Sequence, residues 1–246
     1  MSKAATKKPI RALDLFCGAG GSSWGAKAAG VEVVAGFDLW PLAGKAHKAN
    51  FPDSEFIEGR LEDHDVKKLA KRLGKINLII ASPECTNHSP AKGNKPRCEQ
   101  SKDTAFQVVR YAKAFQPRWV VIENVVSMKR WSRYAEFKGA LQKLGYKMTE
   151  QTLNAAHFGV GQSQRRLFIL CDRKRQPAKT PKTDAVAPKV SSFVDLNGAY
   201  RWTPLRTKRR AQATPDRADR GIQALGEKNH SYSSIMDPTA PAAGRR

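Results

Sequence analysis

The chain has 246 residues, enough for one sizeable hydrophobic core and a small second unit. Its formal net charge of +22 and pI of about 10.2 indicate a polyanionic partner; the alternative is a basic surface that only increases solubility. No segment approaches the roughly 18 apolar residues of a membrane span, and the N-terminus lacks a signal-peptide core. We therefore expect a soluble protein of a reducing, cytoplasmic compartment.

Apolar runs alternate with amphipathic segments along residues 11–172, after a basic tail at residues 1–10. This alternation predicts an α/β domain. The predicted strands span residues 12–16, 31–37, 55–61, 76–81, 119–125, 146–154 and 167–171. The predicted helices span residues 22–29, 41–50, 103–115 and 131–144.

Three of these strands end in residues that could bind a ligand or take part in catalysis. The first runs into a glycine turn, Asp14-Leu15-Phe16-Cys17-Gly18-Ala19-Gly20-Gly21, where glycines permit close approach of a ligand to the backbone. The strand 76–81 ends at Ser82-Pro83-Glu84-Cys85, and the strand 119–125 ends in Glu123-Asn124-Val125. Because ligands and catalytic groups collect at the carboxyl ends of strands in open α/β sheets, we expect one shared site.

The second strand ends in Asp38, about 20 residues beyond the glycine turn. An acid at this point holds ribose hydroxyls in folds that bind adenosine. An alternative role for Asp38 is to cap the following helix. The turn reads GxGG and lacks the full GxGxxG dinucleotide pattern. It therefore favours S-adenosylmethionine, which has no pyrophosphate, over NAD.

These motifs, followed by Gln162-Ser163-Gln164-Arg165-Arg166, give the chain its resemblance to the C5-cytosine DNA methyltransferase family. They occur in the family's order and cover about residues 11–171. The resemblance implies a Rossmann-like S-adenosylmethionine-dependent methyltransferase fold, with a mostly parallel sheet and an antiparallel hairpin at its edge. It also implies double-stranded DNA as substrate, no metal, and the bacterial or phage restriction–modification context typical of such enzymes.

The resemblance also assigns the cofactor contacts. These are Asp14, Phe16, Gly18, Gly20, Gly21, Asp38, Leu39, Leu61 and Pro83. The family usually has an aspartate near position 60 that binds the adenine amino group. Arg60 stands there in this chain, and Glu62 or Asp63 is expected to substitute.

Catalytic roles fall on Cys85, Glu123, Asn124 and Arg166. A Cys85 thiolate would add to cytosine C6, Glu123 would hold a proton at N3, and Arg166 would stabilise the charge on the ring carbonyl. The base must be flipped out of the duplex to be reached. Substrate contacts are expected from Ser89, Gln162 and Gln164.

Four of these residues have a purely structural alternative. Cys85 could be a buried core thiol, Glu123 a salt-bridged or capping carboxylate, and Gln162 and Arg166 braces of the hairpin. The other cysteines, Cys17, Cys98 and Cys171, are not expected to react, and the four together show no paired metal-ligand spacing.

Two positions depart from the family pattern. Glu84 stands where the family has proline, and a carboxylate there would raise the pKa of the thiol unless its side chain points away. Gln164 replaces the first arginine of the family's QxRxR motif, with Arg165 displaced by one. The basic loop at 86–102, which contains Lys92, Lys95, Arg97 and Lys102, suits phosphate contacts, although a solvated loop has the same composition.

Beyond residue 172 the motifs end. Residues 173–200 are expected to be a linker, and residues 201–246 a basic, partial C-terminal region with helical potential at 215–225. We see no counterpart of the family's later motifs, so a second chain or another segment is expected to supply target recognition. Two other functions remain open: methylation of cytosine in tRNA or other RNA, and a catalytically silent remnant that binds nucleic acid.

Overall fold

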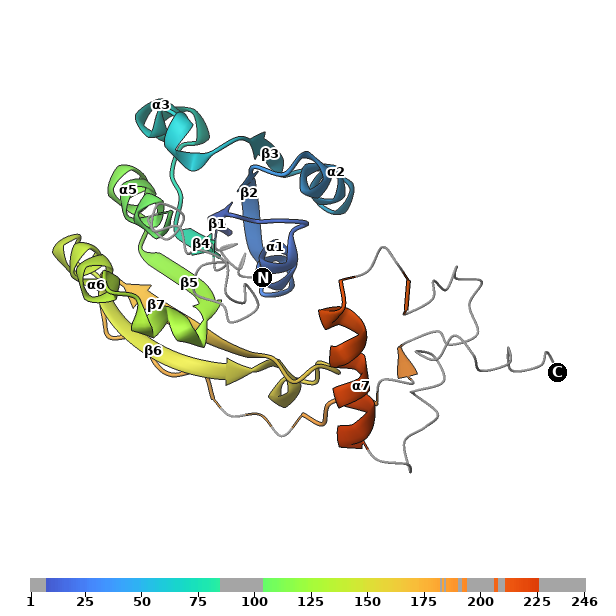
Figure 1. The fold of residues 1–246 in the computed structure, drawn as a ribbon. Coiled ribbons are helices and arrows are strands. Elements are labelled where there is room, and N and C mark those ends of the chain that lie inside the picture. Colours follow the sequence, from blue (N-terminus) through green and yellow to red (C-terminus); the bar gives the residue numbers. More distant parts are fainter. Residues whose placement is uncertain are drawn as a thin grey trace, which may run out of the picture. The chain divides into compact units, whose positions relative to one another are not determined.

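The structure, a computed structural model, describes residues 8–84, 104–181, 183, 185–189, 192–193, 206–207 and 211–225. The chain divides into two compact units, Met1–Val190 and Ser191–Arg246. The first unit holds a sheet with helices on both of its faces (Figure 1). The described part of the second unit contains one helix, α7 (Ala213–Leu225), where helical potential is predicted at 215–225.

The sheet of the first unit has the strand order β3-β2-β1-β4-β5-β7-β6. The strands β3, β2, β1, β4 and β5 are parallel, and β7 is antiparallel to both β5 and β6. This arrangement confirms the mostly parallel sheet with an antiparallel hairpin at its edge. The strands are β1 (Ile10–Leu15), β2 (Val31–Asp38), β3 (Glu55–Glu58), β4 (Leu78–Ala81), β5 (Trp119–Val125), β6 (Lys147–Asn154) and β7 (Arg165–Asp172).

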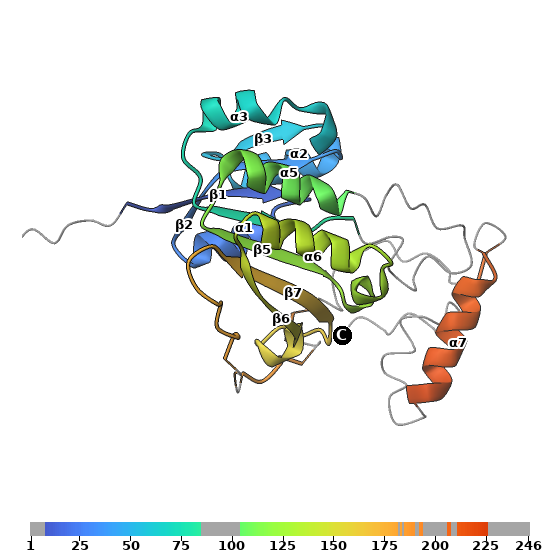
Figure 2. The ribbon, with the colours of Figure 1, turned by 90° about the vertical axis from the view of Figure 1, so that its left-hand side faces the viewer.

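The helices of the first unit form two groups (Figure 2). On one side α3 contacts α5 and α5 contacts α6, while α1 packs on β2 and α2 packs on β2 and β3. No helix in the described part of the chain is long and apolar enough to span a membrane. The helices are α1 (Gly21–Ala28), α2 (Pro41–Asn50), α3 (Val66–Leu73), α5 (Ala105–Phe115) and α6 (Tyr134–Lys143).

The helix α3 is absent from the sequence prediction. Its start is marked by Asp65, whose carboxylate accepts hydrogen bonds from the backbone N–H groups of Lys67 and Lys68 at 3.0 and 3.1 Å. Val66 and Leu69 are buried on its inner face. This spacing and the capping aspartate are visible in the sequence, so the signal for α3 was there to be read.

Most predicted boundaries differ from the observed ones by one to three residues. The strand β3 ends at Glu58, because Gly59 follows in a left-handed conformation (φ +128°) and donates its N–H to the Asp38 carbonyl at 3.1 Å. The strand β4 begins at Leu78 instead of residue 76. The helix α6 begins at Tyr134 instead of residue 131, after a short 3₁₀ helix over Val126–Arg130.

The core lies between the sheet and the layer formed by α3, α5 and α6. Leu13 and Leu15 of β1 and Ile79 of β4 are fully buried there against side chains of these helices. Tyr111 of α5 is also fully buried, and its hydroxyl donates to the Leu61 carbonyl at 3.2 Å. The core therefore holds one face of the central strands rigidly and fixes where they end.

The outer edge of β6 is covered by the chain that follows β7. The Thr149 hydroxyl donates to the Pro177 carbonyl at 2.6 Å, and Thr180 N–H donates to the Gln151 side chain at 2.9 Å. Residues 174–180, placed in the expected linker, thus run along β6. A covered edge is protected from pairing with another chain.

Gly36 on β2 is required by its neighbours. A Cβ there would lie 2.6 Å from His47 Nε2 and 2.9 Å from Cys17 Sγ. Gly36→Ala should lower the free energy of unfolding by about 1–3 kcal/mol through overpacking, measured by urea denaturation. The matched control is Gly139→Ala in α6, where a Cβ meets nothing within 4 Å and should raise stability by up to about 1 kcal/mol. Equal effects of the two changes would contradict this account of the packing.

Candidate active site

The candidate site begins with the register of the parallel strands. Leu15 of β1 lies opposite both Phe37 of β2 and Ala81 of β4, and Ala81 lies opposite Ile122 of β5. The strands β1, β2 and β4 end at this row or one residue beyond it, and β5 continues from it to Val125. The residues that follow each strand emerge side by side along the carboxyl edge of the sheet, as predicted from the strand exits.

The glycine turn after β1 is held close to the end of β2. Cys17 N–H donates to the Phe37 carbonyl, and Gly18 N–H donates to Asp38 Oδ2, both at 2.9 Å. Phe16 and Gly18 have positive φ angles of 62° and 52°. A Cβ on Gly18 would meet nothing within 4 Å, so the space beside its backbone is open for a ligand.

The other two glycines of this turn have different surroundings. A Cβ on Gly20 (φ +98°) would lie 2.4 Å from the Phe51 ring, so glycine is needed there for packing and backbone conformation. A Cβ on Gly21, the first residue of α1, would have no other atom within 4 Å. The structure thus gives Gly20 a packing role besides its expected cofactor contact.

Asp38 joins three chain segments through one carboxylate. Its Oδ2 accepts from Gly18 N–H, and its Oδ1 accepts from Trp40 N–H, both at 2.9 Å. Trp40 is the N-cap residue of α2. Each carboxylate oxygen has a second lone pair, so these backbone bonds leave acceptor capacity for ribose hydroxyls.

A cavity of about 360 Å³ opens beside these strand exits. Its apolar lining includes Phe16, Leu39 and Leu61, three of the expected cofactor contacts. Of the two expected acidic substitutes Glu62 lines the cavity, and its side chain pairs with Arg60 at 3.7 Å. The remaining lining residues are Phe37, Asp38, Gly59, Arg60, Ser82, Glu84 and Thr104. An apolar slot with a few acceptors suits an adenosyl group.

Glu84 is exposed and lines this same cavity. Its side chain therefore belongs to the wall of the expected cofactor site. Pro83 is buried, and its carbonyl accepts from Asn124 Nδ2 at 3.0 Å. This bond ties the chain that leads into residue 85 to the end of β5.

The pair formed by Glu123 and Arg166 lies at the ends of β5 and β7. Arg166 is opposite Val125 in the antiparallel ladder, so it shares a face with Glu123, and its Nε lies 2.9 Å from Glu123 Oε1. Burial raises the pKa of Glu123, and the Arg166 guanidinium and a hydrogen bond with Ser82 offset this only in part. A carboxyl with a raised pKa beside a guanidinium can hold a proton and stabilise negative charge on a bound ring.

The connection between β6 and β7 carries the other motif residues. Gln162 is exposed in this turn, and Gln164 is half-buried. The Asn154 carboxamide oxygen accepts from Ala156 N–H at 3.2 Å and from Gln164 N–H at 2.9 Å. Asn154 therefore fixes the turn, and the backbone of Gln164 helps to close it.

Asp14 lies beneath the glycine turn. It is fully buried, and its Oδ2 accepts from the Ser23 hydroxyl at 2.7 Å, while Oδ1 has no partner among the described residues. Ser23 Oγ also lies 3.5 Å from Nε2 of the buried His47. Burial raises the pKa of Asp14 to about 7, which keeps a proton on this carboxyl under mildly acidic conditions.

Several predictions fall outside the described residues. They concern Cys85, Ser89 and the basic loop residues Lys92, Lys95, Arg97 and Lys102. Cys98 lies there too. The two described cysteines, Cys17 and Cys171, are buried. Burial raises the pKa of Cys171 to about 12 and that of Cys17 further, so neither is a ready nucleophile.

Ser82, Ser23, His47 and Asn154 play roles that the sequence reasoning missed. Ser82 was within reach, since it sits in the same motif as Pro83. Ser23 and His47 meet only through packing of α1 and α2 on the sheet, and a lone histidine in a helix carries no recognisable signal. Among the described residues, no group of three or more His, Cys, Asp and Glu side chains is arranged to hold a metal ion.

The strand order of the sheet reverses between β1 and β4, and a glycine turn and an acid lie at the neighbouring strand exits. This arrangement is typical of α/β folds that bind nucleoside cofactors. Residues 10–238 match the family described as C-5 cytosine-specific DNA methylase, and the chain belongs to that family. The match extends well past residue 171, where the recognisable motifs end.

Relatives with similar sequences are type II methyltransferases of bacteria. M1.BsuMI of Bacillus subtilis is 29% identical over 214 residues, which cover 79% of this chain and 47% of that protein. M.XorII of Xanthomonas oryzae is 31% identical over 209 residues, covering 77% of this chain and 49% of that protein. The chain thus spans about half the length of the curated relatives it matches.

Solved structures share the fold. The methyltransferase EhMeth of Entamoeba histolytica superposes with a TM-score of 0.63 at 18% identity, covering 78% of this chain and 62% of that one. The Dnmt2 methyltransferase of S. pombe gives a TM-score of 0.58 at 19% identity, covering 70% of this chain and 52% of that one. These similarities support the Rossmann-like methyltransferase fold.

Asp14 should make stability depend on pH. Its folded pKa of about 7 exceeds the ordinary 3.8, so the folded state keeps a proton that the unfolded state has lost. This stabilisation is complete below pH 4 and disappears as the pH rises through 7. Between pH 5 and 8, the free energy of unfolding of the wild type should fall by about 3 kcal/mol more than that of Asp14→Asn, as measured by urea denaturation. The free energy of unfolding of the exposed control Asp53→Asn should change with pH as that of the wild type does. The same pH dependence in Asp14→Asn would contradict this account.

Proposed function

We propose that this chain methylates C5 of cytosine in double-stranded DNA, using S-adenosylmethionine and a transient covalent bond between Cys85 and cytosine C6. The observation that carries this proposal is the paired Glu123 and Arg166 at the strand exit next to the chain that leads into Cys85. Family membership supports it. The proposal concerns chemistry; the recognised DNA sequence is a separate question.

The residues around the cavity fit the cofactor in chemical type. We assign the adenosyl group to the slot beside Phe16, Leu39 and Leu61, with ribose hydroxyls on Asp38 and the adenine amino group near Glu62. The open backbone at Gly18 leaves space for the remainder of the molecule. When bound, S-adenosylmethionine supplies an electrophilic methyl group.

The chain's own residues prepare the base. The Cys85 thiolate adds to C6, and the electron pair displaced from the C5–C6 bond makes C5 nucleophilic while charge spreads to N3 and O2. Glu123, whose pKa is raised by burial, donates its proton at N3, and Arg166 stabilises O2. After C5 is methylated, the C5 proton passes to water and the Cys85 sulfur leaves as the thiolate. The Glu123 carboxylate then takes back the N3 proton, which restores the neutral aromatic ring.

Cofactor binding gives the first test. Asp38→Asn should weaken binding of S-adenosylmethionine and of its demethylated product at least tenfold in calorimetry, because a charged acceptor for the ribose is lost. The exposed Asp53→Asn variant is the control, and far-UV circular dichroism without ligand should show both variants folded. Wild type that releases no heat with either ligand at millimolar concentration would overturn the cofactor assignment.

Covalent trapping gives the second test. A duplex carrying 5-fluorocytosine should leave an adduct on the peptide that contains Cys85 when cofactor is present, because fluorine cannot depart as a proton. Cys85→Ser should abolish trapping, Cys98→Ser should leave it unchanged, and Glu123→Gln should slow it by ~10²–10⁴.

The same assay separates the rival functions. Trapping on fluorocytosine-containing tRNA, with none on duplex DNA, would replace DNA by RNA as the substrate. Normal cofactor and DNA binding, with no adduct on either nucleic acid, would identify a catalytically silent member of the family.

A further inference from the structure

A second cavity, of about 600 Å³, opens at the amino edge of the sheet, opposite the candidate active site. Four cations and two aromatic rings contribute to its wall: Lys75, Arg118, Arg173, Lys174, Phe115 and Trp119. They come together because β4 and β5 begin at this edge, where antiparallel β7 ends. The described residues of this wall include no carboxylate.

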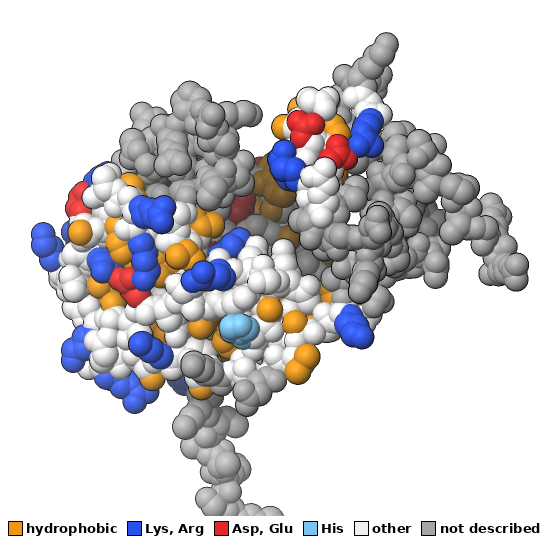
Figure 3. All heavy atoms as spheres, turned by 60° about the horizontal axis from the view of Figure 1, so that its bottom comes forward, with side chains coloured by type: hydrophobic (Ala, Val, Ile, Leu, Met, Phe, Trp, Pro, Cys, Tyr) orange, Lys and Arg blue, Asp and Glu red, His pale blue; other side chains and the backbone are white. Residues whose placement is uncertain are grey.

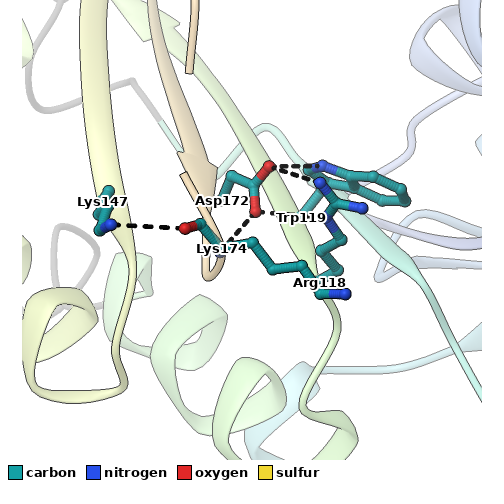
Figure 4. A network of polar contacts seen from close by, with 5 residues as sticks. All are labelled: Arg118, Trp119, Lys147, Asp172 and Lys174. Atoms are coloured by element: carbon teal, nitrogen blue, oxygen red, sulfur yellow. Dashed lines mark hydrogen bonds and ion pairs between the residues drawn. The ribbon is translucent and has the colours of Figure 1, made fainter. Parts of the chain in front are cut away.

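One acidic residue, Asp172, lies behind this wall and organises it (Figure 4). Its carboxylate accepts from Lys174 N–H at 2.7 Å, from Trp119 Nε1 at 3.1 Å, and from Arg118 Nε and Nη2 at 3.3 Å. The Arg118 guanidinium lies 4.4 Å from the centre of the Trp119 ring. Both side chains are thus fixed in place before any ligand arrives.

Asp172 stays ionised at neutral pH. Its burial alone would raise its pKa, but the hydrogen bonds from Lys174 N–H, Arg118 and Trp119 outweigh burial and lower it. The side chain of Asp172 is only 5% exposed, so its charge is directed at its own donors. One buried carboxylate therefore balances one of the four cations, and the cavity keeps an excess of positive charge.

Capping of helix ends explains part of this cluster. Arg173 Nη1 donates to the Gln116 carbonyl at the end of α5 at 3.3 Å. Arg11, which is not part of the wall, donates from Nη1 to the Leu73 carbonyl at the end of α3 at 3.1 Å. These contacts neutralise the negative helix ends. They do not account for the ammonium groups of Lys75 and Lys174, whose described hydrogen bonds here use their backbone atoms.

We propose that this amino-edge cavity binds backbone phosphates of a second DNA segment, separate from the segment whose cytosine is methylated. Arginine and lysine around a fixed, uncompensated positive site are the usual phosphate ligands of proteins. The net charge of +22 and the excess of Lys and Arg over Asp and Glu on the face shown in Figure 3 fit such a partner.

The two edges are well separated. A strand of the length of β5 (Trp119–Val125) spans roughly 20 Å, at about 3.3 Å per residue. The interaction is sequence-independent, because phosphates carry no base information. It would hold the chain on DNA while the catalytic edge is empty. Since it needs neither cofactor nor Cys85, it stands or falls independently of the proposed methyl transfer.

The test reverses two charges whose side chains lie outside the Asp172 network. Wild type should bind two 12-base-pair duplexes per chain in native mass spectrometry and sedimentation, and Lys75→Glu/Lys174→Glu should bind one. The lost site should weaken at least tenfold at 50 mM salt. The slope of log affinity against log salt should fall by about 2, the value for two lost phosphate contacts.

The matched control is Lys45→Glu/Lys67→Glu, an equal charge change on the exposed surfaces of α2 and α3. Thermal unfolding should show that both double variants are folded. The proposal fails if the Lys75/Lys174 variant keeps both duplexes, or if the control loses as much affinity. It also fails if tripolyphosphate protects Trp119 fluorescence from quenching by iodide while duplex DNA does not, since the cavity would then bind small anions only.

Discussion

The register of the four parallel strands is the constraint on which the site depends. Leu15, Phe37, Ala81 and Ile122 stand in one row, and their burial against the α3, α5 and α6 layer leaves no freedom to slide. A shift of one residue would turn the core side chains out to the other face. Core packing along the strands therefore fixes which residues reach the carboxyl edge of the sheet. These are the glycine turn, Asp38, the Pro83 loop and Glu123.

Three carboxyl groups show how position sets chemistry in this fold. Asp14 is fully buried and accepts one hydroxyl hydrogen bond, from Ser23, and burial raises its pKa to about 7. Burial raises the pKa of Glu123, and the neighbouring Arg166 guanidinium offsets this rise only in part. Asp172, with donors on both oxygens, has a lowered pKa and serves as a fixed anion. The side-chain chemistry is shared; the number and kind of donors differ.

We infer that the two edges of the sheet bind different ligands. The carboxyl edge holds an adenosyl-sized slot and a carboxyl–guanidinium pair, which suit a cofactor and a polarised base. The amino edge holds arginines and lysines around two aromatic rings, which suit a backbone without base information. Both edges are built on β4, β5 and β7. A substitution in these strands would therefore disturb both together, whereas surface changes separate them.

Local sequence patterns were enough to predict most strand exits and their reactive residues, because proline, glycine and acidic residues mark where buried runs end. They also indicated the antiparallel hairpin, the family and part of the cavity wall, namely Phe16, Asp38, Leu39 and Leu61. The Asp65 capping signal of α3 was present in the sequence as well. The folded structure was needed to show that Gly20 packs on Phe51, that Glu84 lines the cavity beside the strand exits, and that Asp14 is buried beneath the turn. It alone brought Lys75, Arg118 and Lys174 together. These contacts join residues dozens of positions apart, and local pattern carries no information about which distant side chain will fill or charge a given space.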